Sequence, residues 1–280
     1  MKLANIQTPD GIHLAVLTDR GLVDVTAAGC KLTMQDLICG AELTPLAALT
    51  ADSTLPVVQN PVFANVVNPA GKLVCVGYNY KSHADATGAD LPKAPILFNK
   101  FADALVPCGA AVELPPWEIS YDYEAELVII MGKSAWGVSK EEALDYVFGY
   151  TCGNDVSCRE SQMRTSQFMA GKAMPGFGPC GPWVITADSF DPSAPHSVRS
   201  FVNGELRQDG NTTQMIFDCA TLVSYTSHYV HLQPGDLIFT GTPSGVALEK
   251  KDQGDDVWLK SGDTVDIEIE GIGTLSNKMI

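Results

Sequence analysis

The stretch that decides the fold is Y-D-Y-E-A-E-L-V-I-I-M, residues Tyr121–Met131. Its second half is an unbroken apolar run rich in β-branched residues, which predicts a buried strand. Residues two apart in a strand share a face, so we expect Glu124 and Glu126 to point the same way, about 7 Å apart. Two carboxylates beside an apolar layer repel each other unless a proton or a cation lies between them. Hard divalent cations bind such oxygen ligands, so the pair could belong to a metal site. The alternative interpretation is that the two acids lie at a solvent-exposed strand end.

Charge composition limits the partners of this chain. Its 280 residues are 45% hydrophobic and 18% charged, which is ordinary for a globular protein. The formal net charge is −15, from 33 acidic and 18 basic residues. A field of that sign disfavours nucleic acid and anionic membrane surfaces, so neither partner is expected. It also repels small anions, and an enzyme acting on acids would need local positive charge or a metal.

Three features of the sequence predict a cytoplasmic protein. The N-terminus, M-K-L-A-N-I-Q-T, lacks the apolar core of a signal peptide. No apolar run approaches the roughly 18 residues of a membrane-spanning helix. The eight cysteines include no C-x-x-C pair and are expected to be reduced thiols.

Strand patterns dominate the rest of the chain and do not alternate regularly with helices, which argues against a doubly wound parallel sheet. We expect a β-rich mixed α+β fold, with a small β-rich N-terminal domain over residues 1–68 and a catalytic domain over residues 69–280. A capping box favours a helix over Ser139–Asp145. The apolar spacing of Ile216–Val230 favours a long helix.

A third acid follows the next predicted strand. Asp155 stands in G-N-D-V-S just after the strand Val147–Cys152. Together with Glu124 and Glu126 it would supply three oxygen ligands and leave positions for water and substrate, as Mg²⁺ sites do. Three acids at strand ends are common, however, and the triple alone is a weak signal.

Basic and amide groups lie close after Asp155. Arg159 and Gln162 follow it by four and seven residues, a spacing that keeps polar groups on one helical face. Lys172 lies in A-G-K-A, where small residues allow close approach. Arginine suits a carboxylate and lysine an enolate oxygen. The alternative is a solvated basic helix face.

Two further stretches are candidates. P-G-D-L-I-F-T-G-T-P-S-G-V, Pro234–Val246, ends a strand in a turn that can offer backbone N–H groups and the Thr242 hydroxyl to an oxyanion. His83 follows a strand within a polar segment. The formal G-x-G-x-x-G at Gly176–Gly181 is interpreted as a tight turn, because Pro179 removes a donor and a strand follows.

Taken together, these motifs resemble the fumarylacetoacetate hydrolase superfamily, in particular small bacterial acylpyruvate hydrolases and hydroxymuconate-type isomerase-decarboxylases. The resemblance covers about residues 70–280. It implies a β-roll C-terminal domain, a homodimer and a Mg²⁺ (or Mn²⁺) cofactor. The matching pieces are V-G-Y-N-Y-K-S-H, Y-D-Y-E-A-E-L, N-D-V-S-C-R-E-S-Q, G-K-A with G-P-C-G-P, G-D-L-I-F-T-G-T-P-S-G-V and D-T-V-D-I-E-I-E-G-I-G-T-L.

The resemblance also implies roles for individual residues. The metal ligands would be Glu124, Glu126 and Asp155. The catalytic residues would be His83, as the base that activates water, and Lys172. The substrate-binding residues would be Arg159, Gln162, Thr242 and Lys100.

Two positions depart from the family pattern. Many relatives carry a Glu three residues after the histidine, whereas this chain has Ala86, with Asp85 one residue off register. A general base needs an orienting partner, so hydrolysis would be weakened unless Asp85 or an acid elsewhere supplies one. Lys100 is followed by Phe101-Ala102-Asp103 where relatives often have K-P-x-S.

The resulting hypothesis is a metal-dependent hydrolase that cleaves the C–C bond of a 2,4-dioxo acid of the acylpyruvate or fumarylpyruvate type, through a metal-stabilised enolate, in aromatic catabolism. An oxaloacetate-type decarboxylase, or a 2-hydroxyhepta-2,4-diene-1,7-dioate-type isomerase, could use the same site. A non-catalytic binding protein is a further alternative, and a cysteine-nucleophile hydrolase is disfavoured. We expect residues 80–93 and the surface around Phe101, Trp117 and Phe177 to select the substrate's tail.

Overall fold

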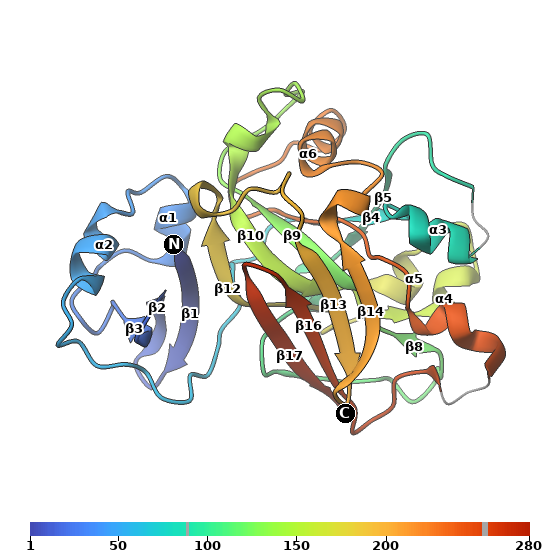
Figure 1. Ribbon diagram of the computed structural model, residues 1–280, viewed down its shortest axis with the longest axis horizontal. Coiled ribbons are helices and arrows are strands. Elements are labelled where there is room, and N and C mark those ends of the chain that lie inside the picture. The colour runs from blue at the N-terminus through green and yellow to red at the C-terminus, as the bar shows by residue number, and fades with distance from the viewer. Residues whose placement is uncertain (88–89, 254–256) are drawn as a thin grey trace.

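The computed structural model describes residues 1–87, 90–253 and 257–280 (Figure 1). A ten-stranded sheet runs through the molecule in the order β3-β2-β1-β12-β10-β9-β15-β4-β5, with β6 beside β12. Its strands are β1 Lys2–Thr8, β2 Gly11–Thr18, β3 Gly21–Asp24, β4 Leu73–Gly77, β5 Ile96–Lys100, β6 Leu105–Pro107, β9 Ala125–Met131, β10 Val147–Asn154, β12 Gly178–Thr186 and β15 Leu237–Phe239.

Strand β9 is buried along its whole length, which explains the unbroken apolar run at residues 127–131. Successive side chains point to opposite faces. Leu127 and Ile129 pack into one core, whereas Val128 and Ile130 pack into another on the other face of the sheet.

A second, five-stranded sheet in the order β14-β13-β16-β17-β7 shares the core of Leu127 and Ile129, to which it contributes Ile267 and Leu275. The hairpin β13–β14 turns at Asn203-Gly204, which both have positive φ. This arrangement confirms the predicted β-rich mixed fold. The strands are β7 Ala111–Val112, β13 Ser197–Val202, β14 Glu205–Asn211, β16 Thr264–Ile269 and β17 Gly273–Met279; a separate pair is β8 Tyr121–Asp122 with β11 Ser157–Cys158.

The N-terminal strands extend the large sheet, because β1 pairs with β12 in the register Lys2↔Ile185 and Leu3↔Val184. In Figure 1 this blue segment lies at one side of the molecule. The domain division near residue 68 stays a prediction. The eight cysteines, all within the described residues, are free thiols. Within the same residues, no helix is both long and apolar enough to cross a membrane.

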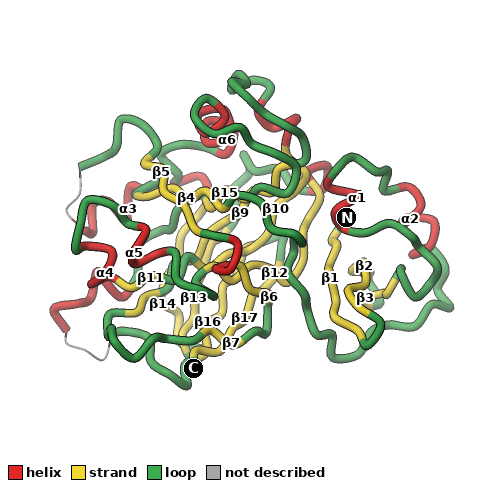
Figure 2. The backbone as a smooth tube through the Cα atoms, turned by 180° about the vertical axis from the view of Figure 1, so that it is seen from behind, coloured by secondary structure: helices red, strands yellow, loops and turns green. Residues whose placement is uncertain are grey.

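Three short helices, α3, α4 and α5, gather at one side of the molecule in both views (Figures 1 and 2). Helices α4 and α5 both contact β11, the short strand that follows Asp155, and α5 also contacts β5. The helices are α1 Met34–Ile38, α2 Thr44–Thr50, α3 Lys81–Thr87, α4 Arg159–Met163, α5 Met169–Lys172 and α6 Cys219–Ser227; the 3₁₀ turns are η1 Ala102–Ala104, η2 Ala143–Tyr146, η3 Ala187–Ser189, η4 Thr212–Gln214 and η5 Ala247–Gln253.

Three local predictions were wrong in extent. The Ser139–Glu142 side-chain pair forms, but only the 3₁₀ turn η2 follows it, because so short a segment gains too few helical hydrogen bonds. Helix α6 begins only at Cys219, since Asn79 binds the backbone N–H groups of the two residues before its N-cap, Asp218. Residues 178–181 belong to strand β12 and not to a tight turn.

Gly171 allows helices α4 and α5 to touch. A Cβ at this position would lie 2.3 Å from the backbone oxygen of Cys158 and 2.4 Å from the backbone nitrogen of Gln162. The sequence A-G-K-A therefore serves contact between two backbones, and this contact sets the separation of Arg159 and Lys172.

We predict that Gly171→Ala destabilises the protein. Alanine gains about 1 kcal/mol in helix propensity, but the clash is with backbone atoms that cannot move aside. We expect a net loss of about 2 kcal/mol in the free energy of unfolding, measured by urea denaturation. The matched control is Ala170→Val on the exposed side of α5, which should change stability by about 0.5 kcal/mol or less. Equal stability of the two variants would contradict the packing argument.

Candidate active site

Three carboxylates converge where β8, β9 and β10 meet. Glu124 lies in the break between β8 and β9, Glu126 lies on β9, and Asp155 directly follows β10. One ligand oxygen from each lies within 4.8 Å of the others, and all three residues are buried. Within the described ranges, this is the one group of three or more metal-ligand side chains at such spacing.

Local hydrogen bonds fix these three positions. The backbone N–H of Glu124 donates to Asn154 Oδ1 at 3.0 Å, and the N–H of Asp155 donates to the carbonyl of Glu124 at 3.0 Å. The strand predicted over residues 121–131 is thus interrupted at its acidic end. The interruption ties Glu124 directly to the end of β10 and brings Asp155 next to it.

Two cations neutralise Glu124. Lys172 Nζ lies 2.7 Å from Glu124 Oε2, and Arg159 Nη2 lies 2.7 Å from Glu124 Oε1. Burial acts to raise the pKa of Glu124, but Lys172 and Arg159 outweigh it and hold that pKa well below its usual range. Burial likewise disfavours the charged form of Lys172, yet Asp155 and Glu124 raise its pKa. Glu124 is therefore an anion and Lys172 a cation at neutral pH.

Glu126 has no such partner. Its Oε2 accepts a hydrogen bond from the Gly241 N–H at 2.7 Å, and no lysine or arginine is paired with it among the described residues. Burial, Asp155 and Glu124 together raise the pKa of Glu126 far above its usual value of 4.5. A buried acid in this state fits a site that takes up a cation, since a positive ion would relieve both the desolvation and the repulsion. The donor set, three carboxylates, suits Mg²⁺ or Mn²⁺.

Lys100 lies behind Asp155 and not in the cavity. Its side chain is fully buried, and Nζ lies 2.6 Å from Asp155 Oδ1. The same ammonium group donates to the carbonyls of Val156 and Lys172. This geometry suits a residue that orients Asp155, whereas the sequence had suggested contact with substrate.

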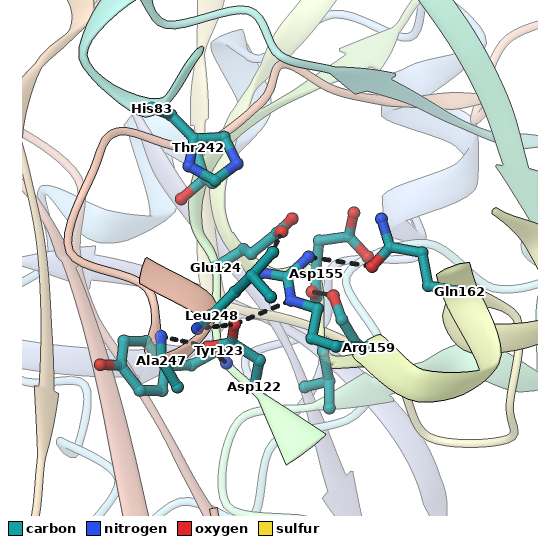
Figure 3. Close-up of polar contacts among 12 residues, drawn as sticks. His83, Asp122, Tyr123, Glu124, Asp155, Arg159, Gln162, Thr242, Ala247 and Leu248 are labelled. Atoms are coloured by element: carbon teal, nitrogen blue, oxygen red, sulfur yellow. Dashed lines mark hydrogen bonds and ion pairs between the residues drawn. The ribbon is translucent and has the colours of Figure 1, made fainter. Parts of the chain in front are cut away.

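Arg159 is held by an acid that the sequence analysis missed. Asp122 is fully buried and lies 2.8 Å from Arg159 Nε. It also accepts hydrogen bonds from the N–H groups of Ala247 and Leu248, at the start of η5. Arg159 in turn donates from Nη1 to Gln162 Oε1 at 3.0 Å. Figure 3 shows this chain of contacts. Asp122 lies within the stretch Tyr121–Met131, but no sequence signal distinguished it from an ordinary polar residue at the end of a strand.

His83 has an acidic partner, and it is not the one next to it in sequence. Nδ1 of His83 lies 2.7 Å from Glu249 Oε1; the His83 side chain is buried and that of Glu249 is partly buried. The other carboxylate oxygen of Glu249 accepts the N–H of Gly245 at 2.6 Å. Asp85 instead pairs with Lys81 at the surface. Glu249 on η5, 166 residues after His83, thus supplies the acid that Ala86 lacks.

Thr242 is locked by two hydrogen bonds. Its hydroxyl donates to the carbonyl of Ala125 at 2.9 Å and accepts from Gln208 Nε2 at 2.7 Å. Gln208 also binds the N–H of Ala125 and the carbonyl of Pro243. The Thr242 turn is therefore fixed against β9 by Gln208, another residue that the sequence gave no reason to single out.

A small cavity lies between these groups, with a volume of about 20 Å³. In Figure 3, His83 and Thr242 lie on one side of Glu124, and Arg159 and Gln162 lie on the other. The residues lining the cavity are Val76, Gly77, Tyr78, His83, Phe98, Glu124, Arg159, Gln162, Phe168, Lys172, Thr242 and Leu248.

The residues expected to select a substrate tail lie elsewhere. Phe177 is fully buried against Tyr121, and Phe101 and Trp117 are exposed at the surface. None of the three lines the cavity. Of the segment 80–93, His83 reaches the cavity, and residues 88 and 89 lie outside the described residues.

Fold and site together define a β-rich protein with a buried carboxylate centre beside a polar cavity. Residues 72–280 match the family described as fumarylacetoacetate (FAA) hydrolase, C-terminal. The chain therefore belongs to the fumarylacetoacetate hydrolase family.

Relatives with several activities resemble this chain. The human protein named oxaloacetate tautomerase FAHD2A, mitochondrial, is 37% identical over 293 residues, which cover 100% of this chain and 92% of the relative. The crystal structure of fumarylpyruvate hydrolase from Pseudomonas aeruginosa in complex with Mn²⁺ and pyruvate is 34% identical with a TM-score of 0.69, covering 76% of this chain and 90% of that one. The 5-carboxymethyl-2-hydroxymuconate delta-isomerase from Mycobacterium smegmatis is 31% identical with a TM-score of 0.77, covering 100% and 98%.

We predict that Glu126→Gln stabilises the metal-free protein and abolishes its response to metal. A folded-state pKa above the usual 4.5 means that ionisation opposes folding. Metal-free wild type should therefore lose stability relative to the variant as pH rises from about 4.5 through the raised pKa. Adding Mn²⁺ at about 100 times its Kd should stabilise wild type by about 2.7 kcal/mol and leave the variant unchanged.

Thermal unfolding with and without Mn²⁺ measures both effects. Glu113→Gln, at an exposed position, is the matched control and should respond to the metal like wild type. A metal response that survives in Glu126→Gln would remove Glu126 from the ligand set.

Proposed function

We propose that the protein is a divalent-metal-dependent enzyme that interconverts the keto and enol forms of a short 2-oxo diacid of the oxaloacetate type. The observation that carries this proposal is the largely buried His83–Glu249 pair, whose histidine lines the same cavity as Glu124. Such a pair is suited to moving a proton. The 37% identity to an oxaloacetate tautomerase over the whole chain supports the same reaction.

The chain's own residues divide the work. The Nδ1–H group of His83 donates a hydrogen bond to Glu249, which leaves Nε2 as the atom through which His83 exchanges a proton with the substrate. It takes a proton from C3 of the ketone and returns it to the C2 oxygen, so that no atom is gained or lost. Lys172, held cationic by Asp155 and Glu124, supplies positive charge where the oxygen becomes negative.

The remaining polar groups bind and orient the substrate. Gln162 accepts from Arg159 through its oxygen, and its amide N–H groups remain to donate to a substrate carboxylate. Glu124, Glu126 and Asp155 would hold the cation. When bound, a divalent cation would act as a Lewis acid toward the 2-oxo acid end of the substrate.

Hydrolysis of a short 2,4-dioxo acid, which the sequence motifs favour, is the second candidate. In that reaction His83 takes a proton from water, whose oxygen adds to the C4 carbonyl. The C3–C4 bond then breaks, and a carboxylic acid and pyruvate are released after C3 gains a proton. The likeness to fumarylpyruvate hydrolase and the presence of an orienting acid for His83 support it. Enol–keto conversion of oxaloacetate and pyruvate release from acetylpyruvate, each assayed with Mg²⁺ and with chelator, distinguish the two reactions.

We predict that Glu249→Gln lowers kcat about 100-fold and leaves KM within about threefold, because Glu249 orients the base and lies outside the substrate cavity. His83→Ala should lose tautomerisation and hydrolysis but keep any metal-dependent decarboxylation, which needs no base. Steady-state kinetics on oxaloacetate provide the measurement.

The matched control is Asp85→Asn, which removes the acid adjacent in sequence and should change neither constant, because Asp85 pairs with Lys81 at the surface. A larger loss in Asp85→Asn than in Glu249→Gln would reverse the assignment of the partner. If the protein binds Mn²⁺ and oxalate but turns over neither substrate, the remaining interpretation is a non-catalytic binding protein. Magnesium as the native ion, a homodimer, a cytoplasmic location and a part in aromatic catabolism stay predictions.

A further inference from the structure

The cavity has one apolar side, built from three aromatic rings. Phe168 lies edge-on to Phe98, with ring centroids 5.7 Å apart, and edge-on to Tyr78, at 6.4 Å. Tyr78 stacks on His83 at 5.6 Å with an interplanar angle of 18°. Lys172 Nζ lies 5.3 Å from the centre of the Phe98 ring. Each of these aromatic residues lines the cavity.

Phe168 is the central member of this aromatic wall, defined as Tyr78, Phe98 and Phe168. It follows residues 164–167, which are all exposed, and its ring turns inward from that surface segment. Its edge also lies against β4, since a Cβ built on Gly77 would come within 3.3 Å of Phe168 Cε2. The ring therefore occupies the space into which a substrate could extend away from the polar side.

The remaining space is small. A free volume of about 20 Å³ is little more than one water molecule needs, so a bound group has to displace neighbouring side chains, and a long chain has to displace more than a short one. The polar side of the cavity, formed by His83, Arg159 and Gln162, is available to a carboxylate or carbonyl group at C4. On the apolar side, Phe98 and Phe168 have no hydrogen-bond donor in their side chains. Their rings already occupy the space on this side.

We propose that Phe168, supported by Tyr78 and Phe98, is the specificity-determining residue that restricts this site to 2-oxo acids with a short main chain. The inference rests on the proposed function and names its substrate class. Longer acyl chains would have to displace the Phe168 ring, and each methylene that finds no room costs about tenfold or more in discrimination.

Binding of unreactive straight-chain 2-oxo acids tests this without any chemical step. Pyruvate, 2-oxobutanoate, 2-oxohexanoate and 2-oxooctanoate lack the second carbonyl, so neither tautomerase nor hydrolase activity affects the result. Isothermal titration calorimetry on the Mn²⁺-loaded protein should show wild-type affinity falling at least tenfold between 2-oxobutanoate and 2-oxohexanoate. In Phe168→Ala this drop should shrink to threefold or less.

Phe168→Leu provides a second variant if the alanine protein does not fold, and should give an intermediate drop. Phe101→Ala is the matched control, because Phe101 is 52% exposed and does not line the cavity; it should keep the wild-type pattern. Wild-type affinity that is independent of chain length, or a drop that persists in both Phe168 variants, overturns the inference. Failure of every 2-oxo acid to bind overturns the proposed function with it. Chain-length selection without turnover upholds the inference and removes only the catalytic proposal.

Discussion

Repulsion among buried carboxylates is the constraint on which the rest of the site depends. Glu124, Glu126, Asp155 and Asp122 lie in one buried cluster with the three cations Lys100, Arg159 and Lys172. Four acids against three bases leave one excess negative charge when all are ionised, and it falls on Glu126, whose pKa is strongly raised. A divalent cation would turn that excess into a single positive charge. An acidic protein of net charge −15 would then present a local positive field to an anionic substrate.

The two sides of the cavity are joined through Asp122. One of its oxygens pairs with Arg159, and the carboxylate as a whole accepts the first N–H groups of η5. The same turn carries Glu249, which binds His83. A single buried carboxylate therefore relates the position of the substrate-binding arginine to that of the proton-transferring histidine. Because a buried charge is costly unless every partner is in place, this linkage also favours one arrangement of the turn over others.

Polar and aromatic groups take separate sides of the cavity, and this division relates the proposed chemistry to substrate size. The polar side supplies donors and a base, whereas Phe98 and Phe168 supply apolar surface. Exclusion of water strengthens the charge interactions of Lys172 and His83 with whatever is bound. Proteins named as a tautomerase, a hydrolase and an isomerase all resemble this chain.

The sequence by itself determined the β-rich class, the buried strand β9 and the family, because these follow from strand-like apolar runs and from short motifs that can be recognised without long-range information. It also named the three acids that the fold gathers within 4.8 Å. Only the tertiary structure decided the partner of His83, since Glu249 is 166 residues away and no local spacing distinguishes it from Asp85. The same holds for Asp122, Gln208 and Phe168, and for the place of Lys100 behind Asp155. Each of these roles depends on which side chains meet across separate elements, and a linear pattern records periodicity along one element and not proximity between two.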